Sequence, residues 1–434
     1  MEDRMIQNKI FPKEDRAEGE TDTARIQEAI DSCHKQGGGR VVLAAGSYVT
    51  GTLCLKSHVT FYLEKGVLLL GSSHIEDYPD NETCFTDAVG HKRGKALLYA
   101  YDADEIGLEG EGVVDGRGGE YPPEHPAHLV RPFLVRLVNC RNIRVRNVTL
   151  RQSAAWCLHV QDSRNVEIMG VTIYNRCNGN NDGIDIDGCS NVDVESCRID
   201  AGDDALCLKS TSEQPCRSIR ICNCQVTTNW AGFKIGTESV GDFQDIMVEN
   251  CFFYDVKGCG IKIVPVDGGN VRNVTLKNIR MLNCTGPVFI STGERLRQYF
   301  AVKRQKPGTI EHLVLENITA DAVTAAGGFY QGAPWGNAKG CVVVSGLQDA
   351  PVRNVIFRSC SFAMPGGIAE MPQGPVPEMG VQYPEFHLFD ILPAWGMYLR
   401  HGDGIVLEQV TMTEKKEDVR PMLVKEDCSN VSEG

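Results

Sequence analysis

Apolar residues recur in a fixed pattern along the chain from residue 143 onward. Each repeat has an apolar residue, a second two positions later and a third five positions later. The residue four positions after the start is Asn, Ser or Gly. Alternating burial is typical of short strands, and Asn, Ser and Gly are typical of turns. The repeats start at Ile143, Val166, Val192, Ile219, Ile246, Val274, Leu313 and Val355.

A repeat of about 25 residues predicts a right-handed parallel β-helix. One coil cannot bury its inward face alone, so successive coils stack on one another. Asn suits the turn because it tolerates left-handed backbone and its amide can bond the Asn of the next coil. An ordinary β-sandwich does not predict one register over eight repeats. We therefore expect an all-β fold, with one parallel β-helix domain over residues 1–434.

Two segments depart from the repeat. Residues 20–36 have apolar residues at helical spacing and are followed by three glycines, which predicts a helix. We expect this helix to cap the open first coil, where unpaired strand edges would otherwise be exposed. Residues 362–403 are rich in Gly and Pro and predict a loop-rich insertion before the last coil.

A second register predicts a row of side chains on the outer face of the coils. Five strand-like segments between residues 156 and 264 align on their apolar residues. Because side chains alternate along a strand, the residue between two inward positions points outward. A solvated surface is the simpler interpretation for any one of these residues, but the row lies beside two acidic clusters. Its members are His159, Asp185, Cys207, Lys234 and Lys262.

The acidic clusters are one repeat apart. Asp182 and Asp185 belong to the first, and Asp203 and Asp204 follow about twenty residues later. One coil between them would bring the two clusters side by side. Adjacent carboxylates are what acid/base cleavage of a glycosidic bond requires, because crowding keeps one of them protonated.

Composition narrows the function further. The net charge of −13 argues against nucleic acid as a partner. No apolar run reaches the 18 residues of a membrane span, and the first residues lack the apolar stretch of a secretion signal. We therefore expect a cytoplasmic location, or secretion if a signal has been removed. Many of the 18 cysteines lie in apolar runs, which indicates reduced core residues rather than metal ligands.

Three motifs resemble glycoside hydrolase family 28, the polygalacturonase-like and rhamnogalacturonase-like pectin hydrolases. The segment 180–185, NNDGID, resembles the Asn-x-Asp-Gly-x-Asp signature of that family, and Gly202-Asp203-Asp204 resembles its second acidic motif. Gly260-Ile261-Lys262 falls where the family has Arg-Ile-Lys. The resemblance extends over residues 20–412.

The resemblance implies an inverting hydrolase that needs no metal or cofactor. Asp203 would be the general acid, while Asp182 and Asp204 would hold and deprotonate the water. Lys262 would bind the substrate carboxylate, and Asn180 would orient its neighbours. The substrate-binding residues predicted for the groove are Asn180, Asp185, His159, Lys234, Glu238 and Lys262.

The chain also departs from polygalacturonases. Trp230-Ala231-Gly232 stands where they have Gly-His-Gly, and Gly260 replaces the Arg of Arg-Ile-Lys. Of the two residues that hold the substrate carboxylate, only Lys262 remains, although Lys234 on the adjacent coil can compensate. We expect cleavage of α-galacturonosyl linkages in pectic oligosaccharides. The loop-rich segment would close one end of the groove and so favour exo action.

Other functions remain open on the same scaffold. A rhamnogalacturonan hydrolase, an α-L-rhamnosidase or a calcium-dependent lyase could share these motifs. A β-helix that binds carbohydrate without turnover is a further alternative, although such a protein needs no acidic pair on adjacent coils.

Overall fold

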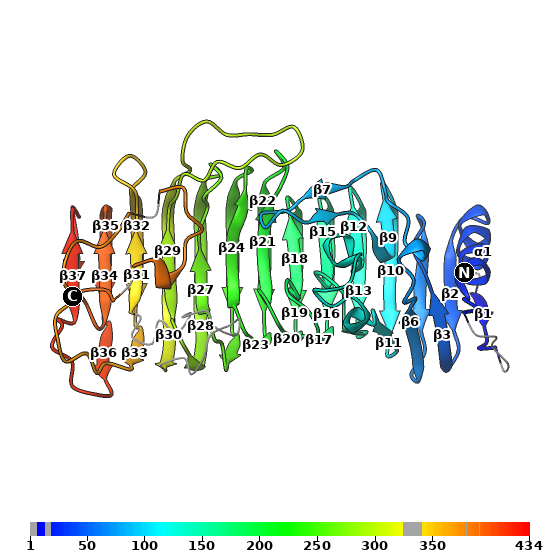
Figure 1. The fold of residues 1–434 in the computed structure, drawn as a ribbon, viewed down its shortest axis with the longest axis horizontal. Helices are drawn as coiled ribbons and strands as arrows, with labels where there is room; N and C mark the ends of the chain where they lie inside the picture. The colour runs from blue at the N-terminus through cyan, green and yellow to red at the C-terminus, as the bar shows by residue number, and fades with distance from the viewer. Residues whose placement is uncertain (1–6, 14–18, 324–340, 379, 390) are drawn as a thin grey trace, which may run out of the picture. The chain divides into compact units, whose positions relative to one another are not determined.

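The computed structural model describes residues 7–13, 19–323, 341–378, 380–389 and 391–434. The chain divides into two compact units, Met1–Asp203 and Asp204–Gly434. Each unit is built from parallel strands (Figure 1). Among the described residues, no helix has the length and apolar character needed to cross a membrane. The prediction of a single domain over 1–434 stays a prediction.

The first unit starts with a strand and a helix. Strand β1 (Gln7–Ile10) pairs with β2 (Gly39–Leu43), and α1 (Thr23–Lys35) lies at the end of the unit beside them (Figure 1). The apolar face of α1 is fully buried. The helix therefore lies within the segment 20–36 predicted as helical, and it covers the first coil of this unit.

Most coils of the first unit contain three strands, which pair with the same strands of the neighbouring coil. The unit also holds the short antiparallel pair β7 (Phe85–Thr86) and β8 (Lys92–Arg93) and three 3-10 helices, η1 (Ile75–Asp77), η2 (Gly118–Glu120) and η3 (His128–Val130). The coil strands are β3 (Gly46–Thr50), β4 (Leu53–Cys54), β5 (Val59–Leu63), β6 (Val67–Gly71), β9 (Ala96–Tyr101), β10 (Asp104–Gly110), β11 (Val113–Asp115), β12 (Phe133–Val138), β13 (Arg141–Arg146), β14 (Thr149–Arg151), β15 (Leu158–Gln161), β16 (Arg164–Met169), β17 (Thr172–Asn175), β18 (Ile184–Asp187), β19 (Ser190–Glu195) and β20 (Arg198–Ala201).

The second unit is built from the same kind of coil. Two of its strands are longer, and each of them bends from one face of the coil to the next. The segment between β33 and β34 holds the 3-10 helix η4 (Phe386–Phe389). The strands are β21 (Leu206–Ser210), β22 (Cys216–Cys222), β23 (Gln225–Thr228), β24 (Ala231–Ser239), β25 (Phe243–Glu249), β26 (Phe252–Tyr254), β27 (Cys259–Ile263), β28 (Val271–Cys284), β29 (Val288–Ser291), β30 (Ile310–Ala322), β31 (Val342–Ser345), β32 (Val352–Arg358), β33 (Ser361–Met364), β34 (Met397–Arg400), β35 (Gly402–Glu408), β36 (Thr411–Glu414), β37 (Leu423–Glu426) and β38 (Ser432–Glu433).

The predicted apolar register forms the core of each unit. In the first unit Ile143 pairs with Val166, and Val166 pairs with Val192. In the second unit Ile246 pairs with Ile219 on one side and with Val274 on the other. These side chains are at most 2% exposed. Crossovers between parallel strands of one sheet are right-handed in nearly all proteins, so the fold is a right-handed parallel β-helix.

The predicted turn position adopts left-handed backbone in all eight repeats. The φ angles lie between 51° and 63°. The amide ladder is also present, because Asn278 Nδ2 donates to Asn250 Oδ1 (2.9 Å) and Asn317 Nδ2 donates to Asn278 Oδ1 (2.8 Å). The turn residues are Asn147, Gly170, Ser196, Asn223, Asn250, Asn278, Asn317 and Ser359.

A second ladder, which the pattern did not reveal, lies one residue before the apolar start of the first three repeats. In the first unit Asn165 Nδ2 donates to Asn142 Oδ1 (3.0 Å), and Asn191 Nδ2 donates to Asn165 Oδ1 (3.2 Å). All three asparagines also have positive φ. These neighbouring coils of the first unit are therefore joined by side-chain amides at this turn as well.

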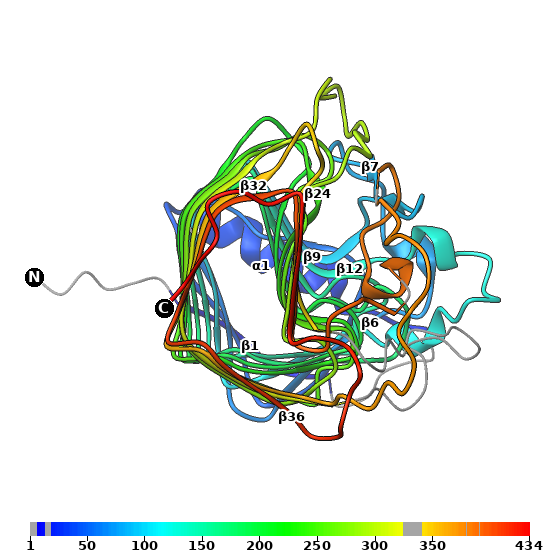
Figure 2. The same ribbon diagram turned by 90° about the vertical axis from the view of Figure 1, so that its left-hand side faces the viewer.

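Two further sequence predictions concern the loop-rich segment and the cysteines. The segment predicted as loop-rich, 362–403, begins inside β33 and ends inside β35, so its strand-free part is the narrower range 365–396. Figure 2 shows this orange segment on the outer side of the sheet that contains β24. All eighteen cysteines lie in described ranges and are free, and fourteen are buried, as expected of small core residues.

Candidate active site

Two of the predicted catalytic carboxylates meet in the first unit. Asp182 lies just before β18, and Asp203 lies just after β20, so one full coil separates them. A carboxylate oxygen of Asp182 and one of Asp203 lie within 4.8 Å of each other. Asp182 is 2% exposed and Asp203 is half-buried. The chain therefore makes the single turn that the sequence predicted between the acidic clusters.

Asn181 fixes this pair through its backbone and its amide. Its carbonyl accepts a hydrogen bond from the Asp203 N–H (3.2 Å). Its fully buried side chain donates from Nδ2 to the carbonyls of Ser153 and Ala155 (both 2.9 Å). A buried amide with its donors satisfied holds the loop rigidly, which sets the position of both carboxylates. Sequence reasoning missed this residue because the family signature leaves its position unspecified.

Asn180 lies beside two buried arginines. Its Oδ1 accepts hydrogen bonds from Arg93 Nη2 (3.3 Å) and Arg131 Nη2 (3.4 Å), and each arginine is 1% exposed. The Asp87 carboxylate holds Arg93 through Nε (2.7 Å). This agrees with an orienting role for Asn180. The two arginines lie outside the repeat pattern, about 50 to 90 residues earlier in the chain, so nothing in the sequence linked them to the site.

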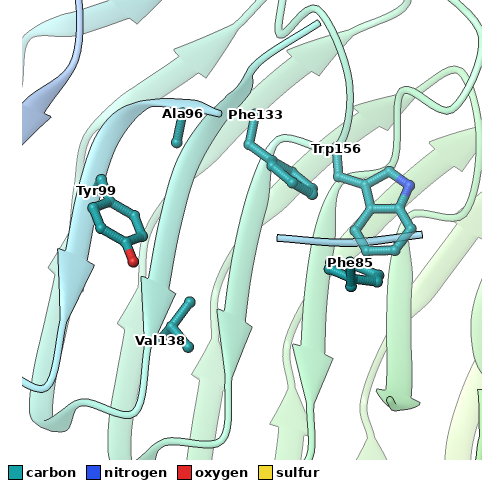
Figure 3. Packing of buried hydrophobic residues seen from close by; sticks show 6 residues of the cluster. All are labelled: Phe85, Ala96, Tyr99, Phe133, Val138 and Trp156. Carbon is teal, nitrogen blue, oxygen red and sulfur yellow. The ribbon is translucent and has the colours of Figure 1, made fainter. Parts of the chain in front are cut away.

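His159 and Asp185 are neighbours in register, as the outward row predicted. Neither faces solvent, since both are completely buried. Phe133 stacks on the His159 ring with centroids 5.3 Å apart, and Trp156 packs edge-on at 5.3 Å. Figure 3 shows Phe85, from the short strand β7 outside the coils, packed beside Trp156. The row faces outward from the coil, but loops cover it in this unit.

A hydrogen bond fixes the His159 ring inside this cluster. Its Nε2 lies 3.2 Å from Asp187 Oδ2, and Arg136 Nε donates to its Nδ1 (3.4 Å). Contact between His159 and a substrate, which the sequence predicted, therefore requires this aromatic cluster to open. The sequence contains one local sign that His159 is buried: the buried apolar residues Trp156 and Cys157 immediately precede its strand.

In the second unit, Asp204 forms an ion pair with Lys234. Lys234 Nζ lies 2.6 Å from Asp204 Oδ2 and 2.8 Å from the Tyr383 hydroxyl. Burial disfavours the charged lysine, but the Asp204 carboxylate outweighs it and raises the pKa of Lys234 well above its usual value. Lys234 therefore remains a cation, and it holds the Asp204 carboxylate through this ion pair. Tyr383 comes from the strand-free segment 365–396, where no repeat pattern predicts a register.

Lys262 is paired as well. It follows Lys234 in register on the next coil, as predicted. Its Nζ forms a salt bridge with Glu385, and the rings of Trp230 (5.4 Å) and Tyr383 (5.4 Å) enclose it. Burial lowers the pKa of Lys262 even though Glu385 opposes this effect, and burial raises the pKa of Glu385. Sequence reasoning did not identify Glu385.

Glu238 is also part of a buried charge network. Lys209 Nζ lies 3.4 Å from its Oε2. Burial alone would raise the pKa of Glu238, but the Lys209 and Arg295 cations lower it to about 2. Glu238 is 4% exposed, so it remains an ionised carboxylate held within the protein. Its predicted role in substrate binding stays a prediction.

The missing arginine has a steric explanation. A Cβ atom at Gly260 would lie 2.4 Å from Met281 Sδ and 2.9 Å from the Pro287 carbonyl. No side chain fits there unless the neighbouring backbone shifts. Gly260 stands where the Arg-Ile-Lys motif has its arginine, so Lys262 has no arginine from this motif beside it.

Comparisons with known proteins place the chain in a family. The profile of glycosyl hydrolases family 28 matches residues 63–330, more than half of the chain. A probable polygalacturonase of Vitis vinifera is 29% identical over 61% of this chain, and an exo-poly-alpha-D-galacturonosidase of Dickeya chrysanthemi is 26% identical over 62%. The matched stretches span 58% and 54% of those relatives, so they do not by themselves fix the activity.

A solved structure agrees in fold. The family 28 exopolygalacturonase of Yersinia enterocolitica has a TM-score of 0.72 at 20% identity, covering 95% of this chain and 75% of that one. The acidic motifs at Asp182 and at Asp203-Asp204 both lie within the range that the family profile matches. The chain belongs to family 28 of the glycosyl hydrolases.

Proposed function

We propose that this protein hydrolyses α-galacturonosyl linkages of pectic oligosaccharides and acts from the chain end. The observation that carries the proposal is the pair of carboxylates at Asp182 and Asp203, followed at once by Asp204. Family membership and the polygalacturonase names of the relatives support the reaction class. The proposed role in the cell is the degradation of pectin fragments.

Each carboxylate has a distinct part in the reaction. Asp203, the half-buried member, donates its proton to the glycosidic oxygen as the bond to the anomeric carbon breaks. Asp182 and Asp204 hold a water molecule, one of them takes its proton, and the water oxygen bonds to the anomeric carbon. Lys234 supports this role because its ammonium group holds the Asp204 carboxylate in place. The released sugar then carries the Asp203 proton.

Inversion at the anomeric carbon is part of the proposal and has its own test. Inverting enzymes usually separate the acid and the base by about 6.5–9.5 Å, to leave room for water, whereas retaining enzymes use about 5–5.5 Å. The nearest oxygens of Asp182 and Asp203 are closer than the first range. Proton NMR of the first-formed product therefore decides the question: a β-anomer from an α-linked substrate supports inversion, and an α-anomer contradicts it.

Exo action is proposed from the strand-free segment 365–396. This segment places Tyr383 on Lys234 and Glu385 on Lys262, so it covers the outer face of β24 and β27. A covered face leaves less room for a long polymer than an open groove does. The activity printed for the Dickeya relative is also exo-acting.

The principal test is a panel of oligogalacturonides with product analysis. We expect release of monosaccharide from one end, and a fall in kcat by about 10²–10⁴-fold in Asp203→Asn, since general acid catalysis contributes that much. Asp193→Asn is the matched control, because Asp193 is exposed on β19 and the substitution changes the charge equally. Wild-type turnover by Asp203→Asn would contradict the assignment. An unsaturated product would indicate a lyase.

We also propose a reducing compartment, the cytoplasm, as the location. Eighteen free cysteines support this, because oxidising compartments favour disulfides. Fractionation of producing cells tests the proposal, and recovery of the protein outside the cytoplasm would contradict it.

A further inference from the structure

Four cations on this face of the second unit each have a carboxylate of the chain itself beside them. Their ion pairs lie on or near β21, β24 and β27, and both partners are buried in all but the Arg295 pair. Their partners are Lys209–Glu238, Lys234–Asp204, Lys262–Glu385 and Arg295–Asp267. A substrate carboxylate that binds here must either displace one of these carboxylates or lie beside a charge that is already balanced.

The pair Lys262–Glu385 bears directly on substrate choice. Lys262 stands in the motif whose lysine is expected to bind the carboxylate of a uronate, and Glu385 occupies that lysine. Lys262 is 1% exposed and Glu385 8%, and the surrounding rings of Trp230 and Tyr383 leave little of the ammonium group accessible. Gly260 has no room for a second cation.

Glu385 is held firmly in place by its neighbours. Phe386 packs edge-on against Phe289 (4.7 Å), and Phe389 packs on the same ring at 5.8 Å. The fit depends on Gly286, where a Cβ atom would lie 2.3 Å from Phe386 Cε2. Buried aromatic packing of this kind stabilises a local conformation. Glu385 is therefore a built component of the site and not a side chain on a loose loop.

We propose that Glu385 determines substrate specificity: it takes the place of a substrate carboxylate beside Lys262, so that the sugar bound there is uncharged. The substrate class is then a pectic oligosaccharide in which a galacturonosyl residue is joined to a neutral sugar or to an esterified uronate. This inference rests on the proposed function for the cleaved bond. A free carboxylate at the same place would be repelled by Glu385, since like charges in a buried site disfavour each other.

The test uses ligands that differ by one carboxylate. Binding of digalacturonate and of its two monomethyl esters is measured by calorimetry in the Asp203→Asn background, in which turnover is expected to be slow. We expect one monoester to bind at least tenfold more tightly than digalacturonate. Adding Glu385→Gln removes the repulsion and releases Lys262, so the preference shifts at least tenfold toward the free acid. Lys262→Met leaves Glu385 in place, and we expect it to shift the binding preference further toward the ester.

The control is Glu370→Gln, an exposed residue of the same segment, which leaves the preference unchanged. Tighter binding of digalacturonate than of both esters before any change at Glu385 overturns the proposal, even if the Glu385 variant does not fold. A folded Glu385→Gln protein with an unchanged preference also overturns it. Because these are binding measurements, they stand apart from the proposed function, which fails if the wild-type protein hydrolyses no pectic oligosaccharide.

Discussion

At the scale of single residues, the ion pair between Lys234 and Asp204 links stability to catalysis. Both residues are at most 2% exposed, so the pair is buried. A buried pair contributes little net stability over an apolar pair, but losing one member leaves an uncompensated buried charge. The pair therefore serves to position the Asp204 carboxylate more than to hold the fold.

Lys234→Met is expected to lower both stability and activity. Removing one partner of a buried pair typically costs about 3–5 kcal/mol, and Asp204 would lose the cation that positions its carboxylate for the water. Urea unfolding and kcat on a galacturonide measure the two effects. Lys257→Met, at an exposed lysine before β27, is the control. Full activity in Lys234→Met would show that the reaction does not depend on this lysine.

Glu238 predicts how stability depends on pH. Its pKa is about 2 in the folded protein, against an ordinary value of 4.5. A carboxylate with a depressed folded pKa contributes stability above its unfolded pKa and loses it as pH falls toward the folded value. The loss between about pH 4.5 and pH 2 is expected to be about 3 kcal/mol.

Urea midpoints at pH 6 and pH 3 measure this dependence. Glu238→Gln should show a smaller decrease in stability between the two values than the wild-type protein, because the substituted side chain does not titrate. The exposed Glu417→Gln variant should retain the wild-type decrease. Equal decreases in all three proteins would show that Glu238 does not control the loss of stability at low pH.

The residues that sequence reasoning found are those that follow the repeat. Asp182, Asp203 and Lys262 stand at fixed offsets from apolar positions, so their place on a coil could be derived. Arg93, Arg131, Tyr383 and Glu385 come from segments between coils, which carry no periodic signal. Their positions depend on how loops pack over the coil, which one sequence does not specify.

At the scale of elements, the strands were predictable and the loops were not. An apolar pair at fixed spacing specifies which face of a strand is buried, because a slip of one residue would reverse every side chain. The outward face was predicted as a polar row, yet Phe85 and Trp156 cover it in the first unit. Burial of an outward residue requires a long-range contact that periodicity does not encode.

The amide ladder at the turns is expected to contribute stability. Asn278 has φ 54° and bonds both Asn250 and Asn317. Asn278→Ala loses both hydrogen bonds and places Ala in left-handed backbone, so we expect a loss of about 1–3 kcal/mol. Asn278→Gly should cost less because glycine accepts this φ. Thermal unfolding compares the two, and a Gly variant less stable than Ala would contradict the backbone argument.

At the scale of the whole molecule, the length of the sequence repeat predicted the solenoid. It did not predict the division into two compact units. In a stack of coils each repeat contacts only its neighbours, so the sequence pattern is the same whether the stack is one cooperative domain or more. The boundary between the compact units falls at Asp203 and Asp204, inside the second acidic motif. Nothing in the repeat pattern marks that point.

The in-register pairing of neighbouring coils has a consequence for how the protein is made. Ile143, Val166 and Val192 pair in succession within the first unit, and Ile219, Ile246 and Val274 do so within the second. Each partner thus leaves the ribosome less than thirty residues after the strand that it joins. A finished coil presents an open strand edge on which the next one can assemble, so the coils can form in the order in which they are synthesised.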